Sequence, residues 1–258
     1  MKRIALICGV IVVPAILAFI VTELEYRQTA APSLKEWQLK AQQGDPAAQH
    51  EIAKSYWHGG EGVVQNKREA VAWFYRAAEQ GHAQAQYALG YAFLHGEGVT
   101  SDASKAAAWW NEAAAQGHAK AQADLGELYA NGYGVEKNME TFWHWIKLAA
   151  EQKEPKALNH AAYTYWEGEL VAQDKNKALR LYREAAERGS EGGQYGLGYT
   201  NFEEKNYREA YIWFYISAEN GFHHSAGMLP VVAAFLSESE IKSAKSDAKS
   251  ILRKIANR

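Results

Sequence analysis

The stretch GHAQAQYALGYAFLHGEGV, residues 81–99, decides the fold of this 258-residue chain. Its apolar residues Ala85, Leu89 and Phe93 are spaced by four, which places them on one face of a helix. This spacing predicts a helix over roughly residues 83–95. The Gly-Glu-Gly-Val sequence that ends the stretch predicts a turn, because glycine tolerates the left-handed backbone that ends helices.

A second helix is predicted after this turn, over roughly residues 102–116. Ala106, Trp109, Ala113 and Ala114 form one stripe along it. The small residues let neighbouring helices approach closely, and the large ring fills the space between them. Neither helix could bury its stripe alone, so helix pairs of this kind must stack on one another.

The helix pair is one copy of a repeat with a nearly fixed period. Trp73, Trp109 and Trp145 are 36 residues apart, Leu181 stands at the next 36-residue step, and Trp213 follows after 32 residues. Self-similarity at such a period is the sequence signature of a repeat array, which usually holds other macromolecules. The phase of the four tryptophans predicts that they are core residues.

Two further residue series recur in the same period and mark where the helices begin and end. Asn and Asp side chains accept from the free N–H groups of a first helical turn, so one series predicts N-caps. It comprises Asn66, Asp102, Asn138, Asp174 and Asn206, of which Asn66 and Asn206 have Glu at capping-box spacing. The second series predicts helix ends and comprises Gly44, Gly81, Gly117, Gly189 and Gly221, with Lys153 where a further glycine is expected.

The quoted unit, followed by Asp102, Ala106 and Trp109, resembles the Sel-1-like repeat, a relative of the tetratricopeptide repeat. The resemblance covers about five units between residues 44 and 220, plus a partial sixth. It implies an all-α fold: a right-handed α-solenoid of stacked helix-turn-helix repeats. Several units depart from the pattern. Unit one has an extra residue at Gly59-Gly60, unit four has Ala161-Ala162 for Leu-Gly, Leu170 for the second turn glycine and Leu181 for Trp, and unit five lacks the glycine turn.

The chain before the repeats is different in kind. Residues 4–22 are uncharged and strongly apolar, and as a helix they would span about 28 Å, close to one bilayer core. Lys2 and Arg3 precede this run, so the positive-inside rule places the repeats across the membrane. We expect a single-pass anchor in the inner (cytoplasmic) membrane, with the repeats on the periplasmic side. The alternative is a signal peptide cleaved after 29–31, which would leave a secreted protein.

The domain organisation follows from these features. Residues 1–31 are the predicted membrane segment and short spacer, 32–236 the repeats, and 237–258 an amphipathic helix that caps the stack. The lysine content of that last helix leaves a membrane-surface or partner helix as the alternative. The only cysteine, Cys8, lies in the apolar run, so an exported repeat domain has no internal disulfide.

Composition and motifs offer little chemistry. A formal net charge of -2 and the lack of a basic tract argue against nucleic acid. None of the nine His has the spacing of a zinc protease helix, and the paired turn glycines lack the strand and lysine of phosphate loops. We therefore expect no enzyme, no metal and no cofactor. The alternative is a protein that binds or hydrolyses cell-wall fragments or penicillin-like compounds, an activity assigned to some secreted relatives.

The resemblance also implies a binding surface. In tetratricopeptide-like arrays the first helix of each unit lines a concave groove, which would bind an unidentified protein partner or peptide segment. The residues two before and two after the Leu of the Leu-Gly pair point into it, and Trp57 and Trp166 lie one turn further along. The predicted groove residues are His50, Lys54, Trp57, Tyr87, Tyr91, Glu127, Asn159, Tyr163, Trp166, Tyr195 and Tyr199. Tyrosine suits a peptide-binding groove because it supplies contact area at low entropic cost. The alternative is that these rings only pack between units.

Overall fold

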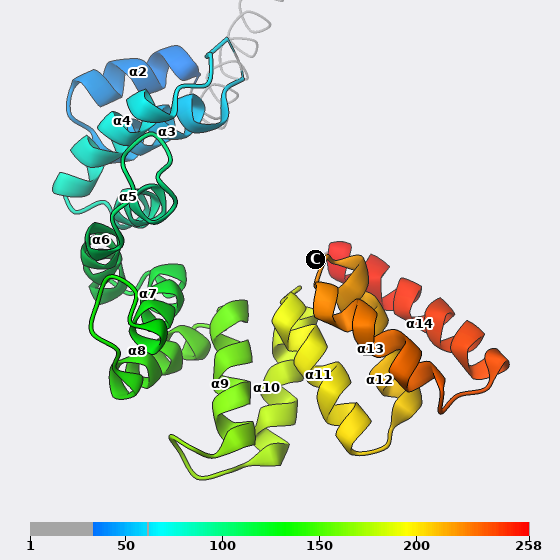
Figure 1. Cartoon of the computed structure of the whole chain (residues 1–258). Helices are drawn as coiled ribbons and strands as arrows, with labels where there is room; N and C mark the ends of the chain where they lie inside the picture. Colours follow the sequence, from blue (N-terminus) through cyan, green and yellow to red (C-terminus); the bar gives the residue numbers. More distant parts are fainter. Residues whose placement is uncertain (1–32, 61, 258) are drawn as a thin grey trace, which may run out of the picture.

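The computed structural model describes residues 33–60 and 62–257, which form thirteen α-helices that follow one another along a curved path (Figure 1). We call the first helix of each repeat the A helix and the second the B helix. The A helices are α3 (Pro46–His58), α5 (Ala83–His95), α7 (Ala119–Asn131), α9 (Pro155–Glu167), α11 (Glu191–Glu203) and α13 (His223–Ala233). The B helices are α4 (Lys67–Glu79), α6 (Ala103–Ala115), α8 (Met139–Glu151), α10 (Lys175–Glu187), α12 (Tyr207–Glu219) and α14 (Glu238–Ala256). The remaining helix, α2 (Leu34–Gln42), packs on α3 as a B helix does.

The apolar core is distributed along this stack. Each of several buried clusters joins consecutive helices, as Phe74 and Leu89 do across α4 and α5, and Trp110 and Leu125 across α6 and α7. Close helix contact requires glycine at one point: a Cβ on Gly90 would lie 2.1 Å from the Trp110 ring. The prediction of an α-solenoid of stacked repeats is confirmed.

The fully buried series of large residues lies one position after the predicted one. Phe74, Trp110, Ile146, Tyr182 and Phe214 are buried, whereas Trp73, Trp109 and Trp145 are half-buried and only Trp213 of the predicted series is buried. Trp109 lies between B helices, with its ring edge-on to Tyr75 at 5.4 Å. Adjacent positions of a helix share the same 36-residue period, so periodicity alone cannot separate the core stripe from this neighbouring one.

Most predicted caps form. Asn66, Asp102, Asn138 and Asp174 each accept from the N–H three residues on, at 2.8–3.1 Å. The prediction for Asn206 is wrong: its side chain makes no cap, and its amide lies 3.4 Å from a Glu204 oxygen. The shortened turn before α12 gives Asn206 a different backbone conformation from the other caps. Lys153 takes the left-handed backbone of the glycines it replaces, with φ of 62°.

The predictions for the two ends of the chain were a C-terminal amphipathic helix and an N-terminal membrane segment. Helix α14 begins after Ser237, which forms a capping box with Glu240, and it packs on α12 through Ala244 and Ala248. The predicted membrane segment, residues 4–22, lies outside the described residues. Among residues 33–60 and 62–257, no helix is both long and apolar enough to cross a bilayer.

Candidate binding face on the A helices

The A helices of units one and two form the first hollow of the molecule, with a volume of about 460 Å³. Five predicted groove residues line it together: His50, Lys54, Trp57, Tyr87 and Tyr91. The Trp57 ring meets the Tyr91 ring edge-on at 6.2 Å, and Tyr91 is 39% exposed. The structure therefore gathers the N-terminal half of the predicted groove into one aromatic surface, in which Lys54 pairs with Glu51.

Histidines cap the A helices next to this hollow, and one of them, His118, lines it. The Nδ1 atoms of His82 and His118 accept from the backbone N–H groups of Ala85 and Ala121, so both act as N-caps in neutral form. The His118 ring stacks on Tyr87 with centroids 4.7 Å apart. Burial lowers the pKa of both histidines, and burial followed by the nearby His82 lowers the pKa of His50 to about 4. These rings are therefore neutral at pH 7.

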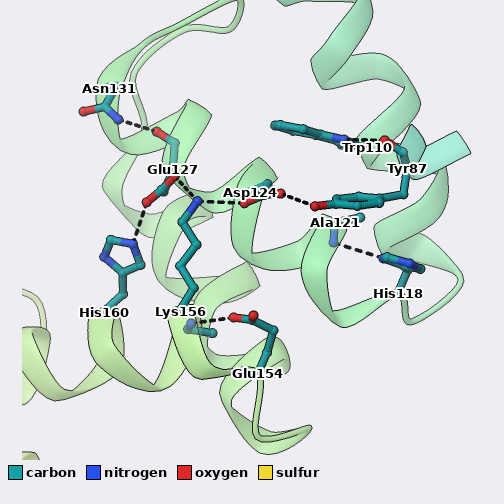
Figure 2. A network of polar contacts seen from close by, with 11 residues as sticks. Tyr87, Trp110, His118, Ala121, Asp124, Glu127, Asn131, Glu154, Lys156 and His160 are labelled. Atoms are coloured by element: carbon teal, nitrogen blue, oxygen red, sulfur yellow. Dashed lines mark hydrogen bonds and ion pairs between the residues drawn. The ribbon is translucent and has the colours of Figure 1, made fainter. Parts of the chain in front are cut away.

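A polar network joins this hollow to the next units (Figure 2). The Tyr87 hydroxyl on α5 donates to Asp124 Oδ2 on α7 at 3.0 Å. The Lys156 ammonium on α9 donates to Asp124 Oδ1 at 2.7 Å and also contacts Glu127. Glu127 Oε1 lies 2.8 Å from His160 Nε2, one turn further along α9. The network thus connects the A helices of three successive units.

The charges in this network compensate one another. Burial alone would raise the pKa of Glu127, but its hydrogen bonds with His160 and Lys156 outweigh burial and lower it. Burial alone would lower the pKa of Lys156, but the carboxylates of Asp124 and Glu127 raise it. Burial and the Asp124 carboxylate raise the pKa of Tyr87, which stays a hydroxyl donor. Glu127 and Lys156 therefore both stay charged near neutral pH.

A second hollow, of about 280 Å³, lies between units three and four. This hollow lies where unit four departs from the repeat pattern. In units two and three a turn glycine packs against the start of the preceding B helix: a Cβ on Gly98 would lie 2.3 Å from the Lys67 carbonyl oxygen, and one on Gly134 2.3 Å from Ala103. In unit four Leu170 occupies this position, and the hollow opens between Leu170 and Met139, the first residue of α8.

The C-terminal groove residues divide into packed and exposed ones. Tyr163 lines the second hollow and is 57% exposed, and Tyr199 is 39% exposed. Tyr195 is half-buried against Phe214 and Phe222, at 5.5 and 5.2 Å. Asn159 packs on the backbone of Gly192, and the Trp166 ring carries the Lys175 ammonium at 4.7 Å. The packing alternative therefore describes Tyr195 and Asn159, whereas Tyr91, Tyr163 and Tyr199 keep exposed rings.

Sequence reasoning missed two features of this face. The first is the set of partners of Tyr87 and Glu127: Asp124, Lys156 and His160. The signal was present, because two carboxylates three apart on one A helix face Lys and His four apart on the next. The second is a series of buried glutamines that bridge consecutive helices, which recurs in the repeat period and comprises Gln49, Gln86, Gln122 and Gln194.

This stack of helix pairs, with hollows and polar contacts on its A helices, defines the class of helical-repeat solenoid proteins. Five Sel1 repeats match the chain, at residues 46–82, 83–118, 119–154, 155–190 and 192–222. The chain belongs to the Sel1 repeat family. The matched borders agree with the A and B helix pairs.

Solved structures similar to this chain share the fold. A protective antigen of uropathogenic Escherichia coli, described as displaying an SLR fold, is 30% identical with a TM-score of 0.71, over 85% of this chain and 49% of its own length. A Sel1 repeat protein from Oxalobacter formigenes is 27% identical with a TM-score of 0.66, over 80% of this chain and 88% of its own. An F-box protein of Arabidopsis thaliana is 42% identical over 64 residues, which cover 24% of this chain and 17% of that protein. The chain spans about half of the first structure and a small part of the plant protein.

Proposed function

We propose that this protein is a scaffold or adaptor whose A helices bind an extended segment of a partner protein. The observation that carries the proposal is that two hollows follow one another along the A helices from α3 to α9. The Tyr87–Lys156 network links them (Figure 2). Tyr91, Tyr163 and Tyr199 present partly exposed rings along this face. Such rigid aromatic rings are typical anchors of protein interfaces.

The test is capture of the partner by crosslinking in the native host. Tyr91, Tyr163 and Tyr199 should be changed together to Ser, while Tyr87 is kept because its hydroxyl and ring hold the network. Tyr133→Ser is the matched control, since this ring is 54% exposed in the turn after α7. We expect the triple variant to lose the crosslinked partner with unchanged circular dichroism. Capture that survives the triple substitution would contradict the proposal.

A binding role is favoured over the hydrolase alternative. The carboxylates of the network are engaged by Lys156 and His160, and neither hollow is lined by a described Ser or Cys that could act as nucleophile. Thr164, in the second hollow, already donates to the His160 carbonyl. We expect no turnover of a chromogenic β-lactam, and measurable turnover that is lost on changing Lys156 or Glu127 would favour the enzyme.

We further propose that the apolar run of residues 4–22 tethers the repeats to the outer side of the cytoplasmic membrane. The support is the length of the run and the position of Lys2 and Arg3 before it. Protease added to spheroplasts should digest the repeats, and the protein should stay with membranes after a carbonate wash. Protection from protease would refute this topology, and release into the soluble fraction would point to cleavage instead.

A further inference from the structure

The second hollow is lined by a carboxylate, that of Glu169, whose counterpart in unit two has a lysine partner that unit four lacks. In unit two Glu97, in the turn after α5, pairs with Lys67, the first residue of α4 in the preceding unit. The residue at the position of Glu97 in unit four is Glu169, and the residue at the position of Lys67 is Met139. Glu169 and Met139 both line the second hollow. The carboxylate is therefore repeated at this junction, but its lysine is not.

The other charged groups near this hollow do not replace that lysine. Lys156 and His160 are engaged by Asp124 and Glu127. Lys175 and Lys177, on the next helix, lie over the rings of Trp166 and Tyr165. Within the described part of the chain, no Lys or Arg lies within ion-pair distance of Glu167 or Glu169. Two carboxylates thus face the hollow without a cation.

The walls of the hollow suit a long cationic side chain. Phe142, Met139 and Leu170 supply apolar surface for an aliphatic stem, and Leu170 is 38% exposed. The largely exposed Tyr163 ring offers a face for a cation–π contact. Burial and then the charges of Glu167 and Glu169 raise the pKa of Tyr163, which shows that both carboxylates act on this ring.

We infer that the hollow between units three and four is a subsite for an arginine or lysine side chain of the bound protein segment, held by Glu167 and Glu169 with its stem on Leu170 and Tyr163. This inference rests on the proposed binding function and names the chemistry of the partner at one position. The incoming cation takes the part that Lys67 plays toward Glu97 at the junction of units one and two.

The test uses the full chain and two fluorescein-labelled pentapeptides, Gly-Ala-X-Ala-Gly, in which X is arginine or the neutral isostere citrulline. Fluorescence anisotropy should show about tenfold tighter binding of the arginine peptide, because only its side chain carries a charge. Glu167→Gln with Glu169→Gln should remove this preference. Met139→Lys should remove it as well, since it restores an internal ammonium beside Glu169. Asn111→Lys, at an exposed position of α6, adds the same charge elsewhere and should leave it unchanged.

Equal binding of both peptides, or an arginine preference that persists in the Glu167/Glu169 or the Met139 variant, would overturn the inference. Its failure is distinguishable from failure of the proposed function. If the protein binds the arginine and citrulline peptides equally while the partner is still captured through Tyr91, Tyr163 and Tyr199, only the cationic subsite is wrong. If the preference is found but no partner is captured through these rings, the subsite stands and the scaffold function fails.

Discussion

The junction between units two and three and the junction between units three and four solve one packing problem in different ways. At the first, the buried Gln122 amide donates to the Ala114 carbonyl at 3.0 Å and accepts from Gln152 at 2.8 Å. At the second, the equivalent position is Leu158, which is 1% exposed and has no amide to donate. Ion pairs of Lys156 with Asp124 and Glu127 connect the two units instead.

This difference shows how a repeat array acquires an individual site. The repeated amide bridge holds neighbouring units together without charged groups. Where the bridge is missing, charged groups on the A helices hold the units together. The same junction also carries Leu170 and Met139, and it contains the second hollow. Three departures from the repeat, at Met139, Leu158 and Leu170, therefore meet at the junction that contains the second hollow.

The largest expected effect on stability concerns the core at the junction between units two and three. Trp110→Ala should lower the free energy of unfolding by about 3–5 kcal/mol, because the ring is fully buried and its removal leaves a cavity. The ring is 2% exposed, and its Nε1 donates to the Tyr87 carbonyl at 3.0 Å. Trp109→Ala is the matched control and should cost about 1–2 kcal/mol, since part of its ring is already in water. Urea denaturation measures both, and an equal or larger loss at Trp109 would contradict the assignment.

The tryptophans show how far the sequence could predict the fold. The period, the helix pairs and four of the five caps were readable because each depends on local residue types at a fixed spacing. Which of two adjacent residues is buried was not readable, since both repeat with the same period. That choice depends on how the two helices of a unit are rotated against each other, and the close contact of Gly90 with the Trp110 ring fixes this rotation in unit two.

We expect the first units to lose stability at a higher pH than the junction between units three and four. His50, His82 and His118 all lie in the first units, and their lowered pKa values mean that the folded state resists protonation. Below the unfolded pKa of about 6.5 the unfolded chain takes up protons first, so stability is lost as pH falls from there toward the folded pKa. For His50, with a folded pKa of about 4, the loss approaches about 3 kcal/mol. Glu127 has a lowered pKa, so its contribution persists until pH falls below the usual glutamate range.

Hydrogen exchange at pH 7 and pH 5, corrected for intrinsic rates, measures this difference. Protection should fall in residues 46–118 and persist in residues 155–222. His50→Phe should reduce the acid-induced loss, because the variant lacks the most strongly shifted imidazole. Equal loss of protection in both segments, or an unchanged acid response in the variant, would show that histidine burial does not set the pH dependence.

A third prediction concerns Lys156, the cation that connects units three and four. Lys156→Met should lower the free energy of unfolding by about 1–2 kcal/mol, between the values for exposed and buried pairs, because the lysine side chain is 41% exposed and solvent screens it. Lys120→Met is the control, since Lys120 stands 36 residues earlier and its ammonium forms no ion pair within the described residues; we expect a change of about 0.5 kcal/mol or less. The urea midpoint at low and high salt measures both, and salt should reduce the difference between wild type and Lys156→Met.

The candidate site was less predictable than the fold for a physical reason. Tyr87 and Glu127 could be placed on the A helices by their phase, but their partners are set by contacts between residues 29–37 positions apart. The second hollow follows from the absence of a glycine at Leu170, and only the close approach of Gly98 and Gly134 to the preceding unit shows what that absence does. The sequence marks Leu170 as a departure without revealing this consequence.

The smallest expected effect comes from giving the second junction the amide bridge of the first. Leu158→Gln alone should cost about 1–2 kcal/mol, because it replaces packed apolar volume by an amide whose oxygen has no partner. Adding Arg188→Gln supplies a side chain at the position of Gln152, and the new pair can repeat the bonds of Gln122, with the Ala150 carbonyl as acceptor. Within the described residues, the ion pair that Arg188 gives up is an exposed one with Glu184, at 3.5 Å. The double variant should therefore recover about 1 kcal/mol relative to Leu158→Gln. A double-mutant cycle in urea measures this coupling, with Arg188→Gln alone as the fourth corner. Additive effects would mean that the backbone at this junction is not positioned to accept the bridge.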